Sequence, residues 1–415
     1  MPNFPPVQEQ MDAIRRGAVE VIPEEELARK LERSRQAGTP LVIKQGFDPT
    51  RPDLHIGHAV SIRKLREFQE LGHQVVFVVG DYTTRVGDPS GRSDTRPRLS
   101  HEEIDANAAT YTEQVGRLLD LTRVRVEFNS RWLAPLDLAA LLELTARYTV
   151  ARMLERDDFA RRHAEGRAIS VVEFLYPLMQ AYDSVALHAD VELGGTDQKF
   201  NLLVGRTIQE RYDQEPQVCL IMPLLRGTDG VRKMSKSYDN YVGITAAPEE
   251  MFGRTMSIPD DLLEEWIRLG ADLEPAAEAA ALAAAGKDPY AAKRALGRRL
   301  VELYHGAEAG DEAEAHFDRL FKDREAPAEM PLVDVSLGDA ALRYEAGVGV
   351  RVAPLLVAAG LADSNSQAMR LMEQGAVSVD EERVEERTAT LPAAAGDERV
   401  LRRGRRHFAR VRFTA

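Results

Sequence analysis

The sequence predicts an α/β protein in which helices cover both faces of a mostly parallel sheet. Short apolar runs alternate with helical segments from residue 41 to about residue 225, and such alternation is typical of strand–helix–strand units. The run Val75–Val79 has no polar break, which indicates a parallel strand buried on both faces. After about residue 245 the signals become helical. We therefore expect a sheet domain followed by further domains.

Changes in composition divide the chain into four parts. We expect the sheet domain over residues 1–232, a helical domain over 233–325, a linker over 326–350 and a separate compact domain over 351–415. The linker prediction depends on a stretch rich in proline, glycine and acidic residues, which is typical of loops. The strands expected in the sheet domain are Leu41–Ile43, Val75–Val79, Val124–Phe128, Val185–Leu193 and Val218–Leu225.

Composition limits the class of protein. The chain has 415 residues, and its 54 Lys and Arg against 67 Asp and Glu give a net charge of −13. This acidic balance argues against a surface that binds nucleic acid as a whole, but not against a local basic patch. The single cysteine, Cys219, excludes an internal disulfide and a cysteine-cluster zinc site. Without a signal core or a membrane-length apolar run, we expect a reduced, cytoplasmic setting and no membrane partner.

The segment 48–58 is the first candidate site. It lies between the first expected strand and a helical pattern, so His55 and His58 fall on one face of that helix's first turn. A helix start carries unpaired N–H groups and the positive end of the helix dipole, and it therefore favours phosphate. Gly57 has no side chain and leaves room for a flat ring. On this segment alone, two exposed histidines at a helix start are the simpler interpretation.

The segment Lys233–Ser237, with the sequence KMSKS, is the second candidate site. Its two lysines are three residues apart and follow a glycine-containing stretch, Arg226–Gly230. Such a loop can fold over a polyphosphate, because lysine ammonium groups are point charges that bind phosphate well. The alternative is a solvated basic loop.

Further polar residues are expected near the ends of the strands. Asp88 lies in the turn Gly87–Gly91, where a carboxylate can bind an ammonium group. The stretch Gly194–Gln198 combines glycines, which allow close approach, with Asp197, which suits a ribose diol. The alternatives are an ordinary turn aspartate and a simple strand-to-helix turn.

A largely apolar helix near residue 170 carries a polar stripe. Ser170 and Glu173 fit a capping box at its start. Tyr176, Gln180 and Asp183 follow at helical spacing and share one face. Because buried polar groups need partners, this stripe either lines a pocket for a small polar ligand or forms an internal hydrogen-bond network. The helical pattern alone does not separate the two.

Taken together, these motifs resemble the class I aminoacyl-tRNA synthetases. His55-Ile56-Gly57-His58 and the KMSKS segment match the two signature motifs of that family without departure. Gly46–Thr50, Gly87–Gly91, the polar stripe and Gly194–Gln198 resemble the bacterial tyrosyl-tRNA synthetases in particular. The resemblance spans nearly the whole chain. It implies a Rossmann-like parallel-sheet catalytic domain, an α-helical domain and a small α+β S-four-type RNA-binding domain.

The resemblance implies a chemistry and a set of roles. L-tyrosine would react with ATP to give tyrosyl-adenylate and diphosphate, and the tyrosyl group would then pass to the 3′ end of tRNA(Tyr). Mg²⁺ would accompany ATP, and no structural metal is implied. Asp183 would accept a hydrogen bond from the phenolic hydroxyl. The implied catalytic residues are His55, His58, Lys233 and Lys236; the ATP-binding residues are these four with Gly57, Gly195 and Asp197; the tyrosine-binding residues are Lys44, Asp48, Asp88, Tyr176, Gln180, Asp183 and Gln198.

Two positions depart from the common pattern of the family. Lys44 stands where many members have a tyrosine that shares the substrate hydroxyl, and the chain resembles a bacterial subgroup with lysine there. Lys44 either supports Asp183 or the hydroxyl contact, or points elsewhere. Lys199-Phe200 replaces a Trp-Gly pair that is common after the glutamine, so the resemblance does not predict which residues form this wall of the pocket.

The last domain resembles the S-four-type RNA-binding domain of bacterial tyrosyl enzymes. Two short helices, Val352–Ala359 and Ser364–Gln374, and then a strand, Ala376–Val379, are expected there. A basic cluster with interleaved aromatics follows, which in an acidic chain indicates a local phosphate-binding surface. A solvated basic tail is the alternative. The RNA-binding candidates are Arg402, Arg403, Arg405 and Arg406.

Two other functions remain possible at this point. A tryptophanyl-tRNA synthetase shares the fold and both signatures, although Asp183 on the polar stripe favours a phenol. A non-catalytic RNA-binding protein on a synthetase scaffold is the second, although intact histidines and lysines argue against it. The resemblance also implies a homodimer, with the segment between residues 128 and 185 at its interface.

Overall fold

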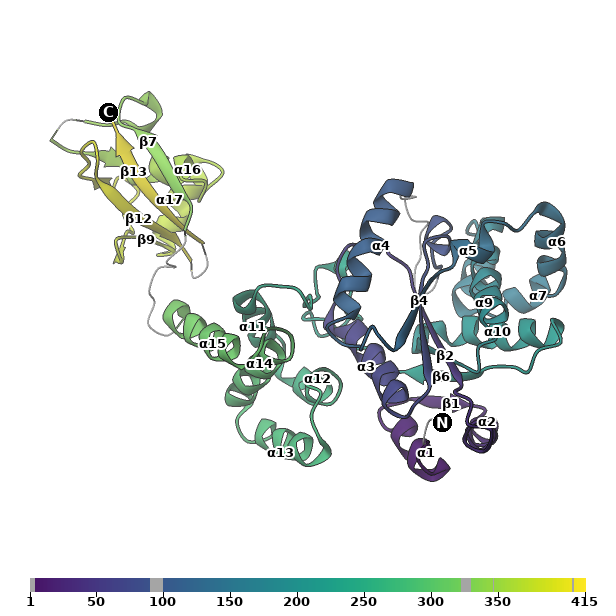
Figure 1. The fold of residues 1–415 in the computed structure, drawn as a ribbon. Helices are drawn as coiled ribbons and strands as arrows, with labels where there is room; N and C mark the ends of the chain where they lie inside the picture. Colours follow the sequence, from purple (N-terminus) through teal and green to yellow (C-terminus); the bar gives the residue numbers. More distant parts are fainter. Residues whose placement is uncertain (1–3, 90–99, 322–329, 346, 405–406) are drawn as a thin grey trace. The chain divides into compact units, whose positions relative to one another are not determined.

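The computed structural model of the chain describes residues 4–89, 100–321, 330–345, 347–404 and 407–415. The chain forms two compact units, Met1–Asp311 and Glu312–Ala415. Figure 1 shows the helices and strands of each unit. None of the described helices is long and apolar enough to cross a membrane.

The first unit is built on one six-stranded sheet with the order β1-β6-β5-β2-β3-β4. All neighbouring strands are parallel except β1, which pairs antiparallel with β6 at one edge. All five residues of Val75–Val79 are buried, as expected for a parallel strand covered on both faces. The strands are β1 Glu20–Ile22, β2 Val42–Phe47, β3 Gln74–Val79, β4 Val124–Phe128, β5 Val191–Gly195 and β6 Val218–Met222.

Helices cover both faces of this sheet, as the alternating pattern predicts (Figure 1). On one side lie α3 and α4, and on the other α9 and α10 pack against each other and against β2, β5 and β6. Four short helices, α5 to α8, lie between β4 and α9 in the sequence. The helices are α1 Val7–Arg15, α2 Glu24–Ala37, α3 Ile56–Glu70, α4 His101–Val115, α5 Ser130–Leu133, α6 Leu138–Ala146, α7 Val150–Met153, α8 Asp157–Ala164, α9 Leu175–Leu187 and α10 Lys199–Arg211.

The strand order creates a crevice at the carboxyl ends of β2 and β5. From β2 the chain moves outward to β3 and β4 on one side, whereas β5 and β6 lie on the other side. Ligands of open parallel sheets bind at such a reversal point, because the loops that leave the two strands diverge there. The segment 48–58 leaves β2 and the stretch Thr196–Gln198 leaves β5, so the topology brings both candidate segments to one place.

One predicted strand differs from the structure. Residues Val185–Leu193 were expected to form a strand, but α9 continues to Leu187 and β5 begins only at Val191. His188 ends the helix in the left-handed conformation, with φ 51°. The apolar alternation at Val185–Leu187 is therefore the buried face of the helix end, which periodicity over a few residues does not distinguish from a strand.

Helices alone follow β6 in the first unit. Trp266 on α12 is fully buried, and its indole N–H donates to the Arg226 carbonyl at 3.0 Å. Through this contact the helices pack beside the loop that follows β6. The elements are α11 Pro248–Met256, α12 Leu263–Gly270, α13 Pro275–Ala285, α14 Pro289–His305 and α15 Ala307–Phe321, the last of which crosses the boundary between the two units.

The second unit has a five-stranded sheet, in the order β10-β9-β12-β13-β7, with helices on one face. Strand β7, Leu332–Ser336, pairs in parallel with β13, and Val335 and Phe413 belong to one buried cluster. The structure therefore differs from the linker expected over 326–350, because the charged and glycine-rich pattern there conceals a short strand. The other elements are β8 Val350–Arg351, α16 Val352–Ala358, α17 Asn365–Glu373, β9 Val377–Val379, β10 Glu382–Arg383, β11 Thr390–Leu391, β12 Glu398–Arg403 and β13 His407–Thr414.

Candidate active site

Both signature segments line one cavity at the crevice of the first unit. His55, Gly57 and His58 face it from the start of α3, and Lys233–Ser237 faces it from the loop after β6. The polar stripe of α9 and the residues after β5 line the same cavity. Residues that are nearly two hundred positions apart in the sequence therefore share one ligand-sized space.

Main-chain hydrogen bonds hold the two segments together. The N–H of Ile56 donates to the Val242 carbonyl at 3.0 Å, and the N–H of Ile244 donates to the Leu54 carbonyl at 3.0 Å. His55 and Gly243 form the bridge between these two bonds. This pairing fixes the start of α3 against the chain that leaves the KMSKS loop, whatever side chains the loop carries.

The two histidine rings are stacked and uncharged. Their centroids are 3.7 Å apart, with an interplanar angle of 19°. Burial, with the nearby ammonium groups of Lys233 and Lys236, lowers the pKa of His58 to about 3. Burial, together with the neighbouring His58 ring and the ammonium groups of Lys236 and Lys233, lowers the pKa of His55 well below its usual value. The main-chain N–H of His55 donates to Nδ1 of His58 at 3.3 Å. The neutral ring of His58 therefore carries its proton on Nε2, where it is a donor.

The two lysines of the loop have different surroundings. Lys233 Nζ donates to Oδ2 of Asp197 at 2.5 Å. Lys236 Nζ is buried and makes no hydrogen bond with the described residues; its nearest carboxylate oxygen, on Asp53, is 3.8 Å away. Burial lowers the pKa of Lys236 to about 8. A buried ammonium group without a hydrogen-bond partner at a cavity wall favours an anionic ligand.

A buried asparagine organises the KMSKS loop. Asn240 is 2% exposed, and its Oδ1 accepts from the Ser235 N–H at 2.8 Å. Its Nδ2 donates to Asp229 Oδ2 at 3.0 Å and to the Lys233 carbonyl at 3.2 Å. The side chain therefore adds to the main-chain bonds of the loop, such as that from the Met234 N–H to the Leu225 carbonyl at 2.8 Å.

Glycines keep the strand ends close to the cavity. A Cβ on Gly195 would lie 2.6 Å from Leu224 Cδ2 and 2.9 Å from Asp197 Oδ1. Since real Cβ atoms do not approach other atoms so closely, any other residue here would push the Leu224 and Asp197 side chains out of their observed positions. Asp197 then stands directly at the cavity.

A second group of polar side chains lines the other part of the cavity. Tyr176 donates to Asp48 Oδ2 at 3.0 Å, and Thr83 donates to Asp48 Oδ1 at 2.8 Å. Gln198 Nε2 donates to Asp88 Oδ2 at 2.7 Å. Asp48 and Asp88 together provide carboxylate charge suited to an ammonium group.

Asp183 is held by two donors that sequence reasoning did not identify. Trp132 Nε1 donates to its Oδ1 at 2.7 Å and Asn129 Nδ2 to its Oδ2 at 3.3 Å. Burial raises the pKa of Asp183 to about 6, although the Lys44 charge and these hydrogen bonds oppose the rise. Asp183 is therefore ionised at neutral pH and can accept a hydrogen bond from a ligand hydroxyl.

Lys44, which was expected among the tyrosine-binding residues, is not one of the residues that line the cavity. It is fully buried, and its Nζ lies 3.0 Å from Glu192 Oε1. Its ammonium group also donates to the Gln180 carbonyl and to Ser184 Oγ, which belong to α9. The other thirteen candidates of the first unit all line the cavity.

Some site residues left only weak signals in the sequence. Asn129 follows β4 directly, a place where ligand-facing residues are expected. Glu192 is the one charged residue in strand β5, and a charge in a buried strand requires a partner. Asn240 had no recognisable pattern, because most of its partners are main-chain atoms of its own loop and the other is the Asp229 carboxylate eleven residues away.

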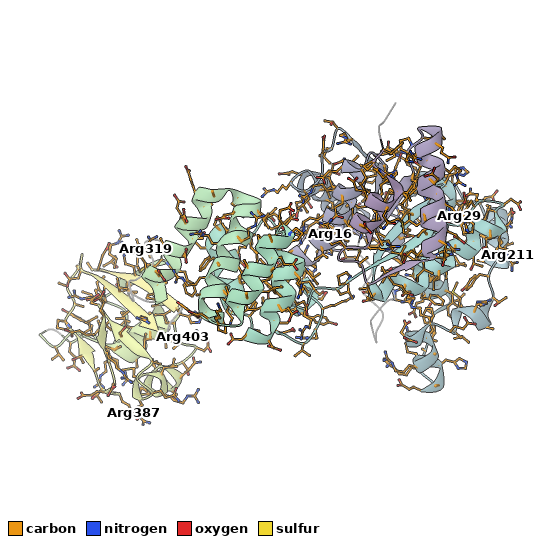
Figure 2. All side chains as sticks on the ribbon, turned by 90° about the horizontal axis from the view of Figure 1, so that it is seen from below. Arg16, Arg29, Arg211, Arg319, Arg387 and Arg403 are labelled. Carbon is orange, nitrogen blue, oxygen red and sulfur yellow. The ribbon has the colours of Figure 1, made fainter. Side chains whose placement is uncertain are left out.

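The basic residues of the second unit differ in their partners. Arg412 binds the Asp334 carboxylate at 2.7 Å, and Arg387, labelled in Figure 2, pairs with Glu373. Arg402 and Arg403 instead donate to main-chain carbonyl oxygens, at 2.7 and 2.9 Å, so their charges are not neutralised by these contacts. The guanidinium of Arg402 also lies 5.4 Å from the centre of the Phe408 ring. The candidates Arg405 and Arg406 lie outside the described residues.

Comparison with known families agrees with this arrangement. The family model described as "tRNA synthetases class I (W and Y)" matches residues 36–322. The model described as "Tyrosine--tRNA ligase SYY-like C-terminal domain" matches residues 343–411. Together they account for the cavity and for most of the second unit.

Individual relatives distinguish between tyrosine and tryptophan. The tyrosine–tRNA ligase of Salinibacter ruber is 49% identical over 409 residues, which cover 99% of this chain and 98% of that protein. That of Moorella thermoacetica is 51% identical over 408 residues, with 98% and 96% covered. A truncated mitochondrial tyrosyl-tRNA synthetase of Aspergillus nidulans has the same fold, with a TM-score of 0.61, 24% identity, and 76% of this chain and 94% of that chain covered. The chain therefore belongs to the class I aminoacyl-tRNA synthetases and, within them, to the tyrosine–tRNA ligases.

Proposed function

We propose how the cavity residues divide the work of a tyrosine–tRNA ligase. The polar stripe of α9 with Asp48 and Asp88 binds L-tyrosine, and the two signature segments bind ATP. The observation that carries this division is that both segments and the stripe line one cavity. The substrate carboxylate is already ionised, so it can attack the α-phosphorus directly while the bond to diphosphate breaks, and no residue has to act as a base.

On the tyrosine side, charge and hydrogen-bonding capacity match the substrate. Asp183 is the acceptor for the phenolic hydroxyl, which phenylalanine lacks. Asp48, Asp88 and Tyr176 surround the ammonium group, supported by the hydrogen bond from Tyr176 to Asp48. Gln198, which is bonded to Asp88, lies next to the substrate carboxylate. A site that binds a hydroxyl rejects the ligand without it, because its buried acceptor is then left unpaired.

On the ATP side, neutral imidazoles and ammonium groups contact the phosphates. The Nε2–H of His58 and the ring of His55 bind the α-phosphate region as uncharged donors, and Gly57 admits the ring of the nucleotide. Lys233 and Lys236 stabilise the charge that develops on the leaving diphosphate. Gly195 and Asp197 hold the ribose. Mg²⁺ enters with the triphosphate as part of the substrate.

The second unit binds tRNA(Tyr). The support is a sheet surface on which Arg402 stacks with Phe408 and keeps its charge available for phosphate. Arg403 adds a second guanidinium at the same strand. The chain would work in the cytoplasm, where its tRNA and ATP are present.

We further propose a homodimer through the helices between β4 and α9. Four large apolar side chains are exposed in that segment, at 72%, 60%, 60% and 78% of their surface. Exposed apolar groups gathered in one segment mark a protein interface. They are Leu138 and Leu142 on α6, Val150 on α7 and Val171 just before α9.

The lysine assignment predicts a selective loss of catalysis. Lys233→Ala and Lys236→Ala should each slow tyrosine-dependent ATP–diphosphate exchange by about 100-fold, because each removes charge stabilisation of the transition state. The dissociation constant for L-tyrosine should change less than about twofold, measured by equilibrium dialysis. Lys199→Ala is the control, since Lys199 pairs with Glu20 outside the cavity. Unchanged exchange in both lysine variants would exclude them from the mechanism.

The raised pKa of Asp183 predicts a pH dependence of tyrosine binding. Its carboxylate is ionised above a pKa of about 6, so lowering the pH from about 7.5 to about 5 should weaken L-tyrosine binding by about tenfold. Calorimetric titration measures this. Asp183→Asn should abolish the pH dependence and erode the rejection of phenylalanine. A variant that keeps both properties would show that another group binds the hydroxyl.

The tRNA assignment predicts that a change in the second unit weakens tRNA binding without affecting the activation of tyrosine. Arg402→Gln should weaken tRNA binding and reduce the salt slope of log K by about one, as expected when one phosphate contact is lost. Filter binding at several salt concentrations measures the slope, and ATP–diphosphate exchange should be unaffected. Arg412→Gln is the matched control, because Asp334 already neutralises Arg412. Equal effects of the two variants would contradict the assignment.

The interface assignment predicts a change of oligomeric state. Leu142→Glu places a charge at the centre of the apolar group and should convert a dimer to a monomer in sedimentation velocity, because burying an unpaired carboxylate is costly. Tyr290→Glu changes a side chain that is 56% exposed elsewhere in the first unit and should leave the dimer intact. A dimer that persists in Leu142→Glu would place the interface elsewhere.

A further inference from the structure

We propose that the buried ion pair of Lys44 and Glu192 is a positioning unit that orients the side-chain amide of Gln180 toward the substrate ammonium. This inference builds on the proposed function, in which the polar stripe of α9 binds L-tyrosine, and it assigns a task to Gln180 within that stripe. Neither member of the pair lines the cavity, so both act through Gln180.

The lysine is completely buried and completely satisfied. Lys44 is 0% and Glu192 1% exposed. Lys44 Nζ lies 3.0 Å from Glu192 Oε1, and it donates to the Gln180 carbonyl at 3.0 Å and to Ser184 Oγ at 2.7 Å. An ammonium group has three protons, so each has one acceptor. A lysine without spare protons has none to offer the ligand.

The glutamate determines which way the Gln180 amide faces. Gln180 Nε2 donates to Glu192 Oε1 at 3.0 Å. An ionised carboxylate can only accept hydrogen bonds, so the NH₂ group must face Glu192 and Oε1 must point away from it. Gln180 Oε1 is buried and has no hydrogen-bond partner among the described residues, and Gln180 lines the cavity. This oxygen is therefore an acceptor available to the substrate.

The orientation matters because the substrate ammonium has only donors. In the observed orientation Gln180 offers an oxygen to the ammonium group. A flipped amide would instead point its NH₂ group at the ammonium group, so that donors would face donors. Lys44 keeps this arrangement in place by its charge. Its ammonium group lies 3.0 Å from Glu192 Oε1, the same oxygen that accepts from the Gln180 amide. A buried carboxylate is costly without a paired cation, so the acceptor that directs the amide depends on Lys44.

Other groups confine the pair to this task. Ser184 donates to Glu192 Oε2 at 3.2 Å, and Gln217 Nε2 donates to the same oxygen. Glu192 Oε2 is thus occupied from α9 and from the segment before β6, which leaves Oε1 to bind Lys44 and Gln180. The carboxylate is fixed on both sides and cannot rotate to release the amide.

The experiment compares two ligands that differ only in the ammonium group. L-tyrosine and 3-(4-hydroxyphenyl)propionate share the ring, hydroxyl and carboxylate, and their dissociation constants are measured on the full chain by equilibrium dialysis. In Lys44→Met/Glu192→Leu an apolar pair replaces the ion pair, a change that cores often tolerate. The dissociation constant of the propionate divided by that of L-tyrosine measures the contribution of the ammonium group. This ratio should fall by about tenfold, because one hydrogen bond to a charged group is lost.

Two variants separate positioning from packing. Glu192→Gln retains an oxygen that accepts from both Lys44 and Gln180, while Gln217 turns its own amide so that its Oε1, which has no partner among the described residues, accepts from the new NH₂ group. This variant should keep the ratio within about twofold of the unmodified chain. Lys30→Met/Asp190→Asn removes another buried lysine pair, with Lys30 1% exposed and 3.1 Å from Asp190, and should also keep it. If the apolar pair does not fold, Lys44→Gln/Glu192→Gln takes its place, since its neutral amides can turn either way and should lower the ratio.

The outcomes distinguish two statements: that Gln180 binds the substrate ammonium, and that the ion pair orients Gln180. Gln180→Met should lower the ratio by itself; if it does not, Gln180 does not bind the ammonium and the proposed role of Gln180 is wrong. If Gln180→Met lowers the ratio but replacing the ion pair does not, or weakens both ligands equally, the pair only supports packing and the inference is overturned.

Discussion

Main-chain pairing between residues 54–56 and 242–244 is the constraint on which the rest of the site depends. It ties the start of α3, which carries both histidines, to the chain that leaves the KMSKS loop. Main-chain hydrogen bonds do not depend on the identity of the side chains, so the two segments stay together while their side chains serve the ligand. The reversal of strand order between β2 and β5 provides the crevice into which both segments face.

The charge on one wall of the cavity is opposite to that of the chain as a whole. The chain carries a net charge of −13. One wall of the cavity nevertheless has two neutral imidazoles and a buried ammonium group that has no hydrogen-bond partner in the described parts of the chain. Burial is the cause in both cases, since it penalises the charged form of histidine and leaves Lys236 without water. Such a wall gains most when a polyanion arrives, because the ligand supplies the hydrogen bonds that the protein withholds.

On the opposite wall the carboxylates already accept hydrogen bonds from other groups of the protein. Asp48, Asp88 and Asp183 each have donors within the protein, so they are held in place before any ligand arrives. Prearranged groups cost little to organise when the substrate binds. Lys44 and Glu192 extend the same principle one layer deeper, because this buried pair does not line the cavity but holds the amide of Gln180, which does.

The sequence by itself determined the sheet, its helices and the candidate residues, because apolar periodicity and short motifs are local properties. It predicted that His55, Lys233 and Asp183 belong to one ligand site, and the cavity brings them together. It did not separate the end of α9 from a strand, or find β7 in a charged stretch, because strand pairing depends on distant partners. The role of Lys44 and the loop contacts of Asn240 were likewise decided only by the tertiary structure. A side chain on a strand faces whatever the neighbouring strand offers, and no local pattern records that neighbour.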